Sequence, residues 1–131
     1  MIKVITFDDI QPLYKEAKKH QLLMSDKLTY FGYYERRGGR LDIRKLVAFN
    51  GYKIRGKKVI LDCAYCVPDC RGRGIYTKLH NFRMEYIQNN HDFKVAEVTC
   101  TKYSRGLHIK NGAELIHTFK VSGWEKYKYE L

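Results

Sequence analysis

The feature that most constrains this chain is an apolar segment that leads through a glycine-rich turn directly into an amphipathic helix. Residues 58–67, KVILDCAYCV, form the most apolar run of the chain, which is typical of a strand in the middle of a sheet. The turn follows at residues 71–74, RGRG, and apolar residues then recur at helical spacing from Ile75 to Asn89. This order predicts an α/β architecture.

The remaining segments alternate between strand and helix patterns. We expect one domain over residues 1–131, with a mixed sheet and the element order β-α-β-β-β-α-β-α-β-β. The expected strands lie at residues 1–7, 28–35, 44–52, 58–67, 94–101, 115–121 and 124–131, and the expected helices at about 8–24, 75–89 and 104–110. Asn50-Gly51 and Arg55-Gly56 compete for the turn after the third strand, and the pattern leaves both open.

Composition limits the function classes. Hydrophobic residues make up 44% of the chain, which is enough for a packed core and excludes disorder by composition. No apolar run approaches the roughly 18 residues of a membrane helix, and residues 1–7 lack the features of a secretory signal. We therefore expect a cytoplasmic protein without a membrane segment. The net charge of +11 attracts anions, which fits nucleic acid, an acidic protein surface or a polyphosphate cofactor.

Four cysteines raise the question of a metal site. Cys63, Cys66 and Cys70 form a C-x2-C-x3-C pattern, and Cys100 is the fourth. The first two lie in an expected strand, where a spacing of three points them to opposite faces. We therefore expect reduced cytosolic thiols and no metal.

The glycine-rich turn is the segment that predicts chemistry. A turn of this kind at the start of a helix presents unpaired backbone N–H groups and the positive end of the helix dipole. Such an arrangement binds phosphate, and Arg71 and Arg73 would strengthen it. The chain has neither the G-x-G-x-x-G fingerprint of dinucleotide-binding folds nor a P-loop.

Residues 67–79, VPDCRGRGIYTKL, resemble the loop that binds the acyl-CoA pyrophosphate in the GNAT superfamily of N-acetyltransferases. The family pattern Arg/Gln-x-x-Gly-x-Gly/Ala falls on Arg71, Gly74 and Tyr76, so a bulky ring replaces the last small residue. That ring would either narrow the approach of the pyrophosphate or point aside. Downstream, the family's Lys-x-Gly is kept at residues 110–112.

Other downstream positions depart from the family pattern. His108 replaces a tyrosine, Thr101 an asparagine and Ala113 a phenylalanine. The resemblance nevertheless implies a mixed, mostly antiparallel sheet of six to seven strands with about three helices, and acetyl-CoA as cosubstrate. The cofactor-binding residues that it implies are Cys66, Val67, Arg71, Gly72, Arg73, Gly74, Ile75, Tyr76, Thr101 and Ser104.

The resemblance also implies direct attack of an amine on the thioester. The main chain of Cys66 would stabilise the thioester oxygen. His108 would protonate the leaving thiolate, with Tyr103 and Ser104 as alternatives. Asp62 is the first candidate for the base, since burial in an apolar strand would raise the pKa of its carboxyl. Glu97 is the second candidate, and a water chain without a dedicated base is the third possibility.

The acceptor amine is not identified by any motif. Residues 20–30, 36–44 and 120–124 would select it, and their mixture of cations and aromatics fits either a solvated surface or an anionic acceptor such as RNA, a protein N-terminus or lysine, or a small molecule. Both a monomer and a homodimer are open. The alternative function is a GNAT-shaped basic module that binds nucleic acid or protein with weak or no catalysis, and an unrelated nucleic-acid-binding domain ranks third.

Overall fold

The computed structural model describes residues 1–20, 22, 24–36, 44–101 and 104–131. The chain divides into two compact units. The first unit comprises Met1–Tyr52 and Cys63–Ile87, and the second comprises Lys53–Asp62 and Gln88–Leu131.

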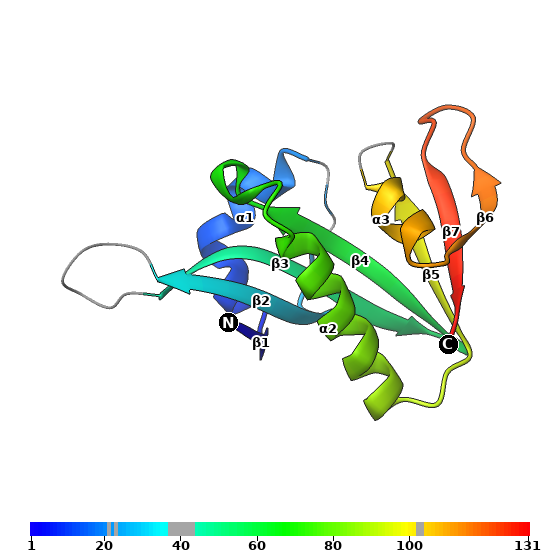
Figure 1. Ribbon diagram of the computed structural model, residues 1–131, viewed down its shortest axis with the longest axis horizontal. Coiled ribbons are helices and arrows are strands. Elements are labelled where there is room, and N and C mark those ends of the chain that lie inside the picture. Colours follow the sequence, from blue (N-terminus) through cyan, green and yellow to red (C-terminus); the bar gives the residue numbers. More distant parts are fainter. Residues whose placement is uncertain (21, 23, 37–43, 102–103) are drawn as a thin grey trace. The chain divides into compact units, whose positions relative to one another are not determined.

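The element order is the one that the sequence predicts. It runs β1 (Ile2–Ile5), α1 (Gln11–Lys18), β2 (Thr29–Arg36), β3 (Arg44–Arg55), β4 (Lys58–Cys66), α2 (Ile75–Asn90), β5 (Val95–Cys100), α3 (Arg105–Lys110), β6 (Glu114–Thr118) and β7 (Glu125–Glu130), as Figure 1 shows. Two short 3-10 helices, Asp8–Ile10 and Pro68–Cys70, precede α1 and α2.

The strands follow the hydrogen-bonded order β1-β2-β3-β4-β5-β7-β6. The apolar strand β4 therefore holds the middle position, as its composition predicts. β4 and β5 are parallel, whereas the pairs β1–β2, β2–β3, β5–β7 and β6–β7 are antiparallel. The prediction of a mixed, mostly antiparallel sheet with about three helices is thus confirmed for the described residues. Within that part of the chain, no helix is long and apolar enough to cross a membrane.

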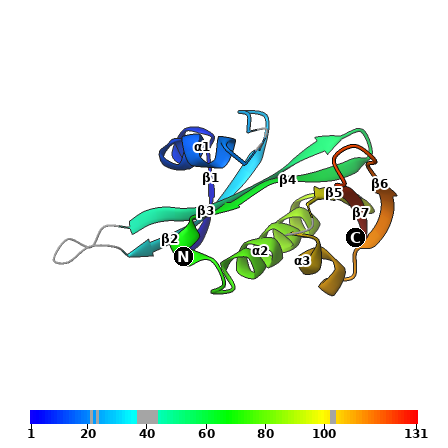
Figure 2. The same cartoon turned by 90° about the horizontal axis from the view of Figure 1, so that it is seen from above.

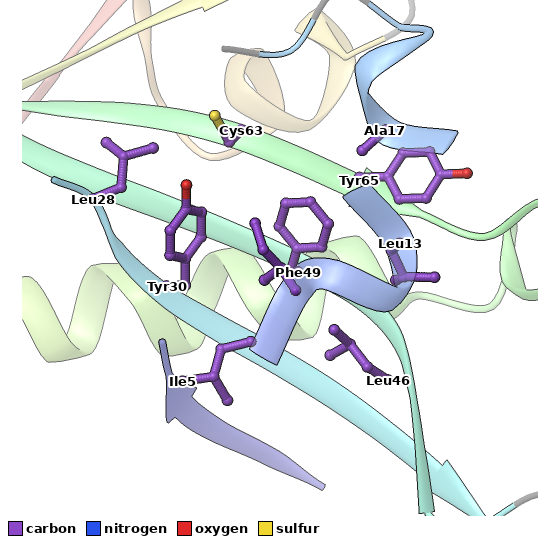
Figure 3. Packing of buried hydrophobic residues seen from close by; sticks show 10 residues of the cluster. Ile5, Leu13, Ala17, Leu28, Tyr30, Leu46, Phe49, Cys63 and Tyr65 are labelled. Atoms are coloured by element: carbon purple, nitrogen blue, oxygen red, sulfur yellow. The ribbon is translucent and has the colours of Figure 1, made fainter. Parts of the chain in front are cut away.

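In the first unit, helices cover both faces of the strands (Figure 2). On the α1 face, aliphatic side chains of the helix meet aromatic rings of β2, β3 and β4 (Figure 3). The cluster comprises Ile5, Ile10, Leu13, Ala17, Leu28, Tyr30, Leu46, Phe49, Cys63 and Tyr65. On the α2 face, Phe31 packs edge-to-face against Phe82 and Tyr86. Neighbouring residues of β2 thus supply opposite faces, because strand side chains alternate.

The first helix is shorter than predicted. The sequence predicts a helix to about Met24, but α1 ends at Lys18. The side chains of Leu22 and Met24 still reach the hydrophobic cluster as partly buried neighbours. The apolar spacing beyond the helix therefore reports contact with the core rather than continued helix.

The competing turn signals resolve in favour of the later pair. Asn50 and Gly51 lie inside β3, and the turn forms at Gly56, whose φ is +62°. Gly51 faces Tyr30 in the strand register, and a Cβ at this glycine would lie 3.0 Å from the Thr29 carbonyl oxygen. The glycine is therefore needed for the close approach of two strands, not for a turn.

In the second unit, β7 pairs with β5 on one side and with β6 on the other. Tyr127 and Tyr129 of β7 are buried. Ser104 precedes α3, and Gly112 ends it with a φ of +90°. Gly123 closes the β6–β7 hairpin with a φ of +72°, which confirms the predicted turn at Ser122-Gly123.

Candidate functional site

The glycine-rich loop leaves β4 through a fixed series of backbone hydrogen bonds. The N–H of Val67 donates to the Val47 carbonyl of β3 at 2.9 Å. The next two bonds, from Cys70 to Val67 and from Arg71 to Pro68, form the 3-10 helix that turns the chain away from the sheet. The start of α2 is therefore held by the strand that precedes it.

Two glycines give the loop its shape. Gly72 and Gly74 have φ values of +78° and +76°, in the left-handed region that costs other residues about 1–2 kcal/mol. A Cβ at either position would meet nothing within 4 Å, so the requirement is conformational and the loop surface is open.

The loop ends at the N-terminus of a long helix, α2. The N–H of Lys78 donates to the Gly74 carbonyl, and this bond begins the ladder of the 16-residue helix α2. The amides of residues 75–77 come before that bond, so they have no acceptor inside the helix. These N–H groups and the helix dipole together attract an anion.

Arg71 lies beside the end of β4. Its Nε donates to the Cys66 carbonyl at 3.0 Å, and its guanidinium lies 5.9 Å from the centre of the Tyr65 ring. A guanidinium carries five N–H donors, so this anchoring bond leaves the planar head able to bind a phosphate. Arg71 is thus both positioned and chemically suited.

Arg73 has a different environment from the one expected. Its guanidinium forms a two-point ion pair with Glu35 of β2, with a shortest N–O distance of 2.5 Å. The thiol of Cys70 lies 3.6 Å from the same carboxylate. The charge of Arg73 is therefore matched within the first unit, and its main contribution is to tie the loop to β2.

Tyr76 is the position that departs from the family pattern, and its ring points aside along β4. Its hydroxyl donates to the Ala64 carbonyl at 3.3 Å. Burial of the hydroxyl, followed by the nearby Cys66, raises the pKa of Tyr76 to about 12. The phenol is therefore neutral at physiological pH and covers a carbonyl in the segment that leads into the loop.

The cysteines are packed as single thiols. Cys63, Cys66, Cys70 and Cys100 are all free and buried. Burial first, and Cys70 second, raise the pKa of the Cys66 thiol, so it is protonated and a weak nucleophile. Cys63 and Cys66 are both buried, and Cys63 has a φ of +55°. Among the described residues, no group of three or more His, Cys, Asp or Glu side chains could hold a metal ion.

His108 of α3 is buried rather than on the surface. Its Nδ1 lies 2.5 Å from the Tyr129 hydroxyl of β7. This hydrogen bond fixes the orientation of the imidazole, although which of the two groups donates depends on the tautomer. An oriented imidazole is suited to proton transfer near neutral pH.

Glu97 of β5 lies between two lysines. Lys58 Nζ is 3.0 Å from its carboxylate and Lys126 Nζ is 3.7 Å away. Burial acts to raise the pKa of Glu97, but the Lys58 hydrogen bond and both lysine charges outweigh it and lower the pKa. The carboxylate is therefore held as an anion, which suits an ion pair better than a general base.

Asp62 is less buried than the sequence predicts. Its side chain is 31% exposed and lies 4.0 Å from Lys53 Nζ, so the expected buried carboxyl is not found.

Thr101 accepts hydrogen bonds at its carbonyl from the amides of Ser104 and Arg105, which places it at the start of α3. Tyr103 lies outside the described residues.

The first unit also contains a cavity of about 390 Å³ beside the segment that enters the loop. Apolar side chains form much of its wall, and Glu16, Lys45 and Asp69 add charge. Glu16 also accepts a hydrogen bond from the Tyr65 hydroxyl at 3.0 Å. No sequence pattern indicates this cavity, because its lining residues come from three separated segments that share no motif.

Glu35 and Tyr129 are further residues that sequence reasoning missed. Glu35 is the partner of Arg73, and Tyr129 is the partner of His108. An acidic residue near the end of an expected strand and a tyrosine in an alternating strand are common features, so neither carried a usable signal. Only the packing of distant segments identifies them.

No protein-family model and no curated protein matches the chain. Solved structures do resemble it. Ribosomal-protein-alanine N-acetyltransferase from Brucella melitensis has a TM-score of 0.76 at 18% identity, over 100% of this chain and 99% of that chain. Arabidopsis thaliana NAA60 in complex with acetyl-CoA has a TM-score of 0.74 at 13% identity, over 100% and 98%. IAA acetyltransferase from Bacillus cereus has a TM-score of 0.72 at 16% identity, over 100% and 99%.

Proposed function

We propose that this chain, which has the GNAT acyltransferase fold, is an acyl-CoA-dependent N-acyltransferase that transfers an acetyl group from acetyl-CoA to a primary amine. The observation that carries the proposal is the loop at the start of α2. The loop combines consecutive backbone amides at a helix N-terminus with Arg71, which is anchored at the end of β4, and this donor set suits a pyrophosphate.

The residues present fit the pyrophosphate of CoA. Gly72 and Gly74 leave open space above the loop, so a phosphate can approach the backbone. Arg71 is the cation that we assign to the phosphates, because Arg73 is already paired with Glu35. The remaining cofactor contacts that we assign, at Cys66, Val67, Ile75, Tyr76, Thr101 and Ser104, follow from the family resemblance.

The reaction requires three events. The amine nitrogen forms a bond to the thioester carbonyl carbon, the C–S bond breaks, and CoA leaves as a thiolate that takes up a proton. The attacking nitrogen loses a proton, so the products are an amide and CoA–SH. The protein must therefore stabilise the carbonyl oxygen and move protons.

We assign the proton for the thiolate to His108. The resemblance to the family supports this role, and the contact of its Nδ1 with the Tyr129 hydroxyl fixes the orientation of the ring. His108→Gln should lower kcat about 10²–10⁴-fold and leave the Kd for acetyl-CoA unchanged, because His108 does not belong to the phosphate loop. An unchanged kcat would remove this assignment and favour Tyr103 or Ser104.

We propose that no carboxylate is dedicated to deprotonating the amine. Glu97 is stabilised as an anion by two lysines, and Asp62 is partly exposed beside Lys53. Asp62→Asn and Glu97→Gln should each retain more than about a tenth of kcat if water removes the proton. A loss of about 10²-fold or more in either variant would identify that residue as the base.

The cavity in the first unit is our candidate for the acceptor. It borders residues 67–69, which lead into the loop, and two carboxylates in its wall attract an ammonium group. This electrostatic preference supports a cationic amine with an apolar body ahead of the anionic acceptors considered from the sequence. Glu16→Gln should raise KM for such an amine more than KM for acetyl-CoA.

The cytoplasmic location of the protein stays a prediction.

A second candidate function has one observation in its favour. The Tyr76 hydroxyl donates a hydrogen bond to the Ala64 carbonyl of β4. The small residue that the family pattern has at this position would leave that carbonyl open. This would suit a basic GNAT-shaped module that binds a nucleic acid or protein with weak or no catalysis.

The two functions are separated by a turnover assay. Release of the CoA thiol from acetyl-CoA is followed with a thiol reagent, in the presence of polyamines, peptides or RNA, and with the His108→Gln variant as control. Amine-dependent thiol release that the variant loses would support the acyltransferase. Tight, salt-sensitive RNA binding without thiol release would support the binding module.

A further inference from the structure

Exposed apolar side chains concentrate in one short part of the second unit. Five of the nine exposed large hydrophobic residues among those described lie between positions 109 and 121. They are Ile109, Leu115, Ile116, Phe119 and Val121. Single exposed apolar residues are ordinary, but a cluster of this kind marks an interaction surface.

The cluster is built around an edge strand. β6 is the last strand in the order and, within the described residues, pairs only with β7 (Figure 1). All five residues of β6 are exposed. Its outer N–H and C=O groups are therefore available to another strand.

Natural edge strands are usually protected against pairing, and β6 has little protection. The opposite edge strand, β1, is four residues long and carries Lys3, whose ammonium lies over the Tyr34 ring. Between Glu114 and Lys120, by contrast, β6 and its extension contain neither a formal charge nor a proline. A bulge between Leu115 and His117 adds local twist but no charge.

The sequence of this edge is complementary to itself. β6 ends at Thr118, Phe119 follows it and Lys120 begins the turn to β7. When two copies of residues 114–120 are aligned antiparallel about His117, Glu114 at the start of β6 faces Lys120 in the turn of the other copy, and Leu115 faces Phe119. Twofold symmetry repeats both pairs, as an isologous interface requires. Opposite charges and apolar pairs directly across two strands stabilise a sheet.

We propose that this chain forms a homodimer in which the β6 edges of two copies pair antiparallel about His117. The partner is a second copy because the charges at the two ends of the edge, Glu114 and Lys120, match each other in this register alone. Each copy carries a net charge of +11, so general repulsion opposes association and the two Glu–Lys pairs select the register. This inference does not depend on the acyltransferase activity.

The first test is the mass of the full chain in solution, measured by sedimentation velocity over a range of concentrations. The chain mass is 15.6 kDa, so a dimer has twice that mass, about 31 kDa. A shift toward 31 kDa with rising concentration supports the proposal. A mass that stays at 15.6 kDa at every concentration up to several hundred micromolar overturns it.

The second test uses charge reversal at the two ends of the edge. Glu114→Lys and Lys120→Glu each place like charges opposite each other twice, so each should raise the dimer Kd roughly tenfold or more. An equimolar mixture of these two variants restores opposite charges in both pairs, so it should form a mixed dimer. A general loss of folding cannot produce this recovery.

Lys27→Glu is the matched control, because Lys27 is exposed in the first unit and its reversal makes the same change in net charge as Lys120→Glu. The control should keep the parent's Kd. If both edge variants also keep it, or if their mixture associates no better than either alone, the β6 register is wrong and the proposal fails.

Discussion

Replacing His80 with glutamine should make the stability of this protein less sensitive to a fall in pH from 7.5 to 5.0. His80 of α2 is 2% exposed, and its Nδ1 lies 3.5 Å from the Arg83 guanidinium. Arg83 in turn donates to the Gly51 carbonyl at 3.0 Å. Burial first, and the charge of Arg83 second, lower the pKa of His80 from 6.5 to about 4. Protonation of this ring therefore opposes the folded state.

The size of the effect follows from the two pKa values. Below pH 6.5 the unfolded chain binds a proton at His80, whereas the folded chain does so only near pH 4. The contribution of neutral His80 is therefore complete above pH 6.5 and is lost as the pH falls toward 4. The whole interval corresponds to about 3 kcal/mol, of which about 2 kcal/mol is lost by pH 5.0.

The assay is urea denaturation of the parent and His80→Gln at both pH values. Because glutamine does not titrate, the parent should lose about 2 kcal/mol more than the variant between pH 7.5 and 5.0. His20→Gln, at an exposed position after α1, is the matched control and should follow the parent. Equal losses in the parent and His80→Gln would refute the reasoning, whatever the stability of either at pH 7.5.

Three further predictions concern the loop. Gly74→Ala, at a φ of +76°, should lower the free energy of unfolding by about 1–2 kcal/mol, whereas Gly106→Ala, inside α3, should raise it by up to about 1 kcal/mol, both by denaturant titration. Tyr76→Ala should lower the Kd for acetyl-CoA, because it uncovers a carbonyl of β4, and calorimetry showing weaker binding would contradict this role. Glu35→Gln should lower the denaturation midpoint slightly by loss of the ion pair to Arg73 and should keep acetyl-CoA binding, since we do not assign Arg73 to the phosphates.

The order of elements was predictable because local patterns carry it. The apolar run of β4, the glycines of the loop and the turn at Ser122-Gly123 all act over a few residues. The end of α1 was not predictable from such patterns, because Leu22 contacts the core although it lies outside the helix. The choice between Asn50-Gly51 and Arg55-Gly56 was left open for a similar reason, because the close approach of the neighbouring strand at Gly51 decides it.

The candidate site was predictable only in part. The loop depends on residues that are adjacent in the chain, so its glycines and Arg71 could be identified. Pairings between distant segments could not, and Arg73 with Glu35 and His108 with Tyr129 are of this kind. The burial of His80 and Arg83 in α2 could not be predicted either. The apolar pattern of this helix gave no reason to expect a buried histidine and a buried arginine.

Acetyl-CoA binding to the loop is the central claim, and isothermal titration calorimetry tests it most directly. Acetyl-CoA is titrated into the parent, into Arg71→Glu, and into Lys15→Glu, which makes the same change in net charge at an exposed position of α1. We expect micromolar binding by the parent and Lys15→Glu, and at least about tenfold weaker binding by Arg71→Glu. No heat of binding from the folded parent, or equal binding by Arg71→Glu, would contradict it.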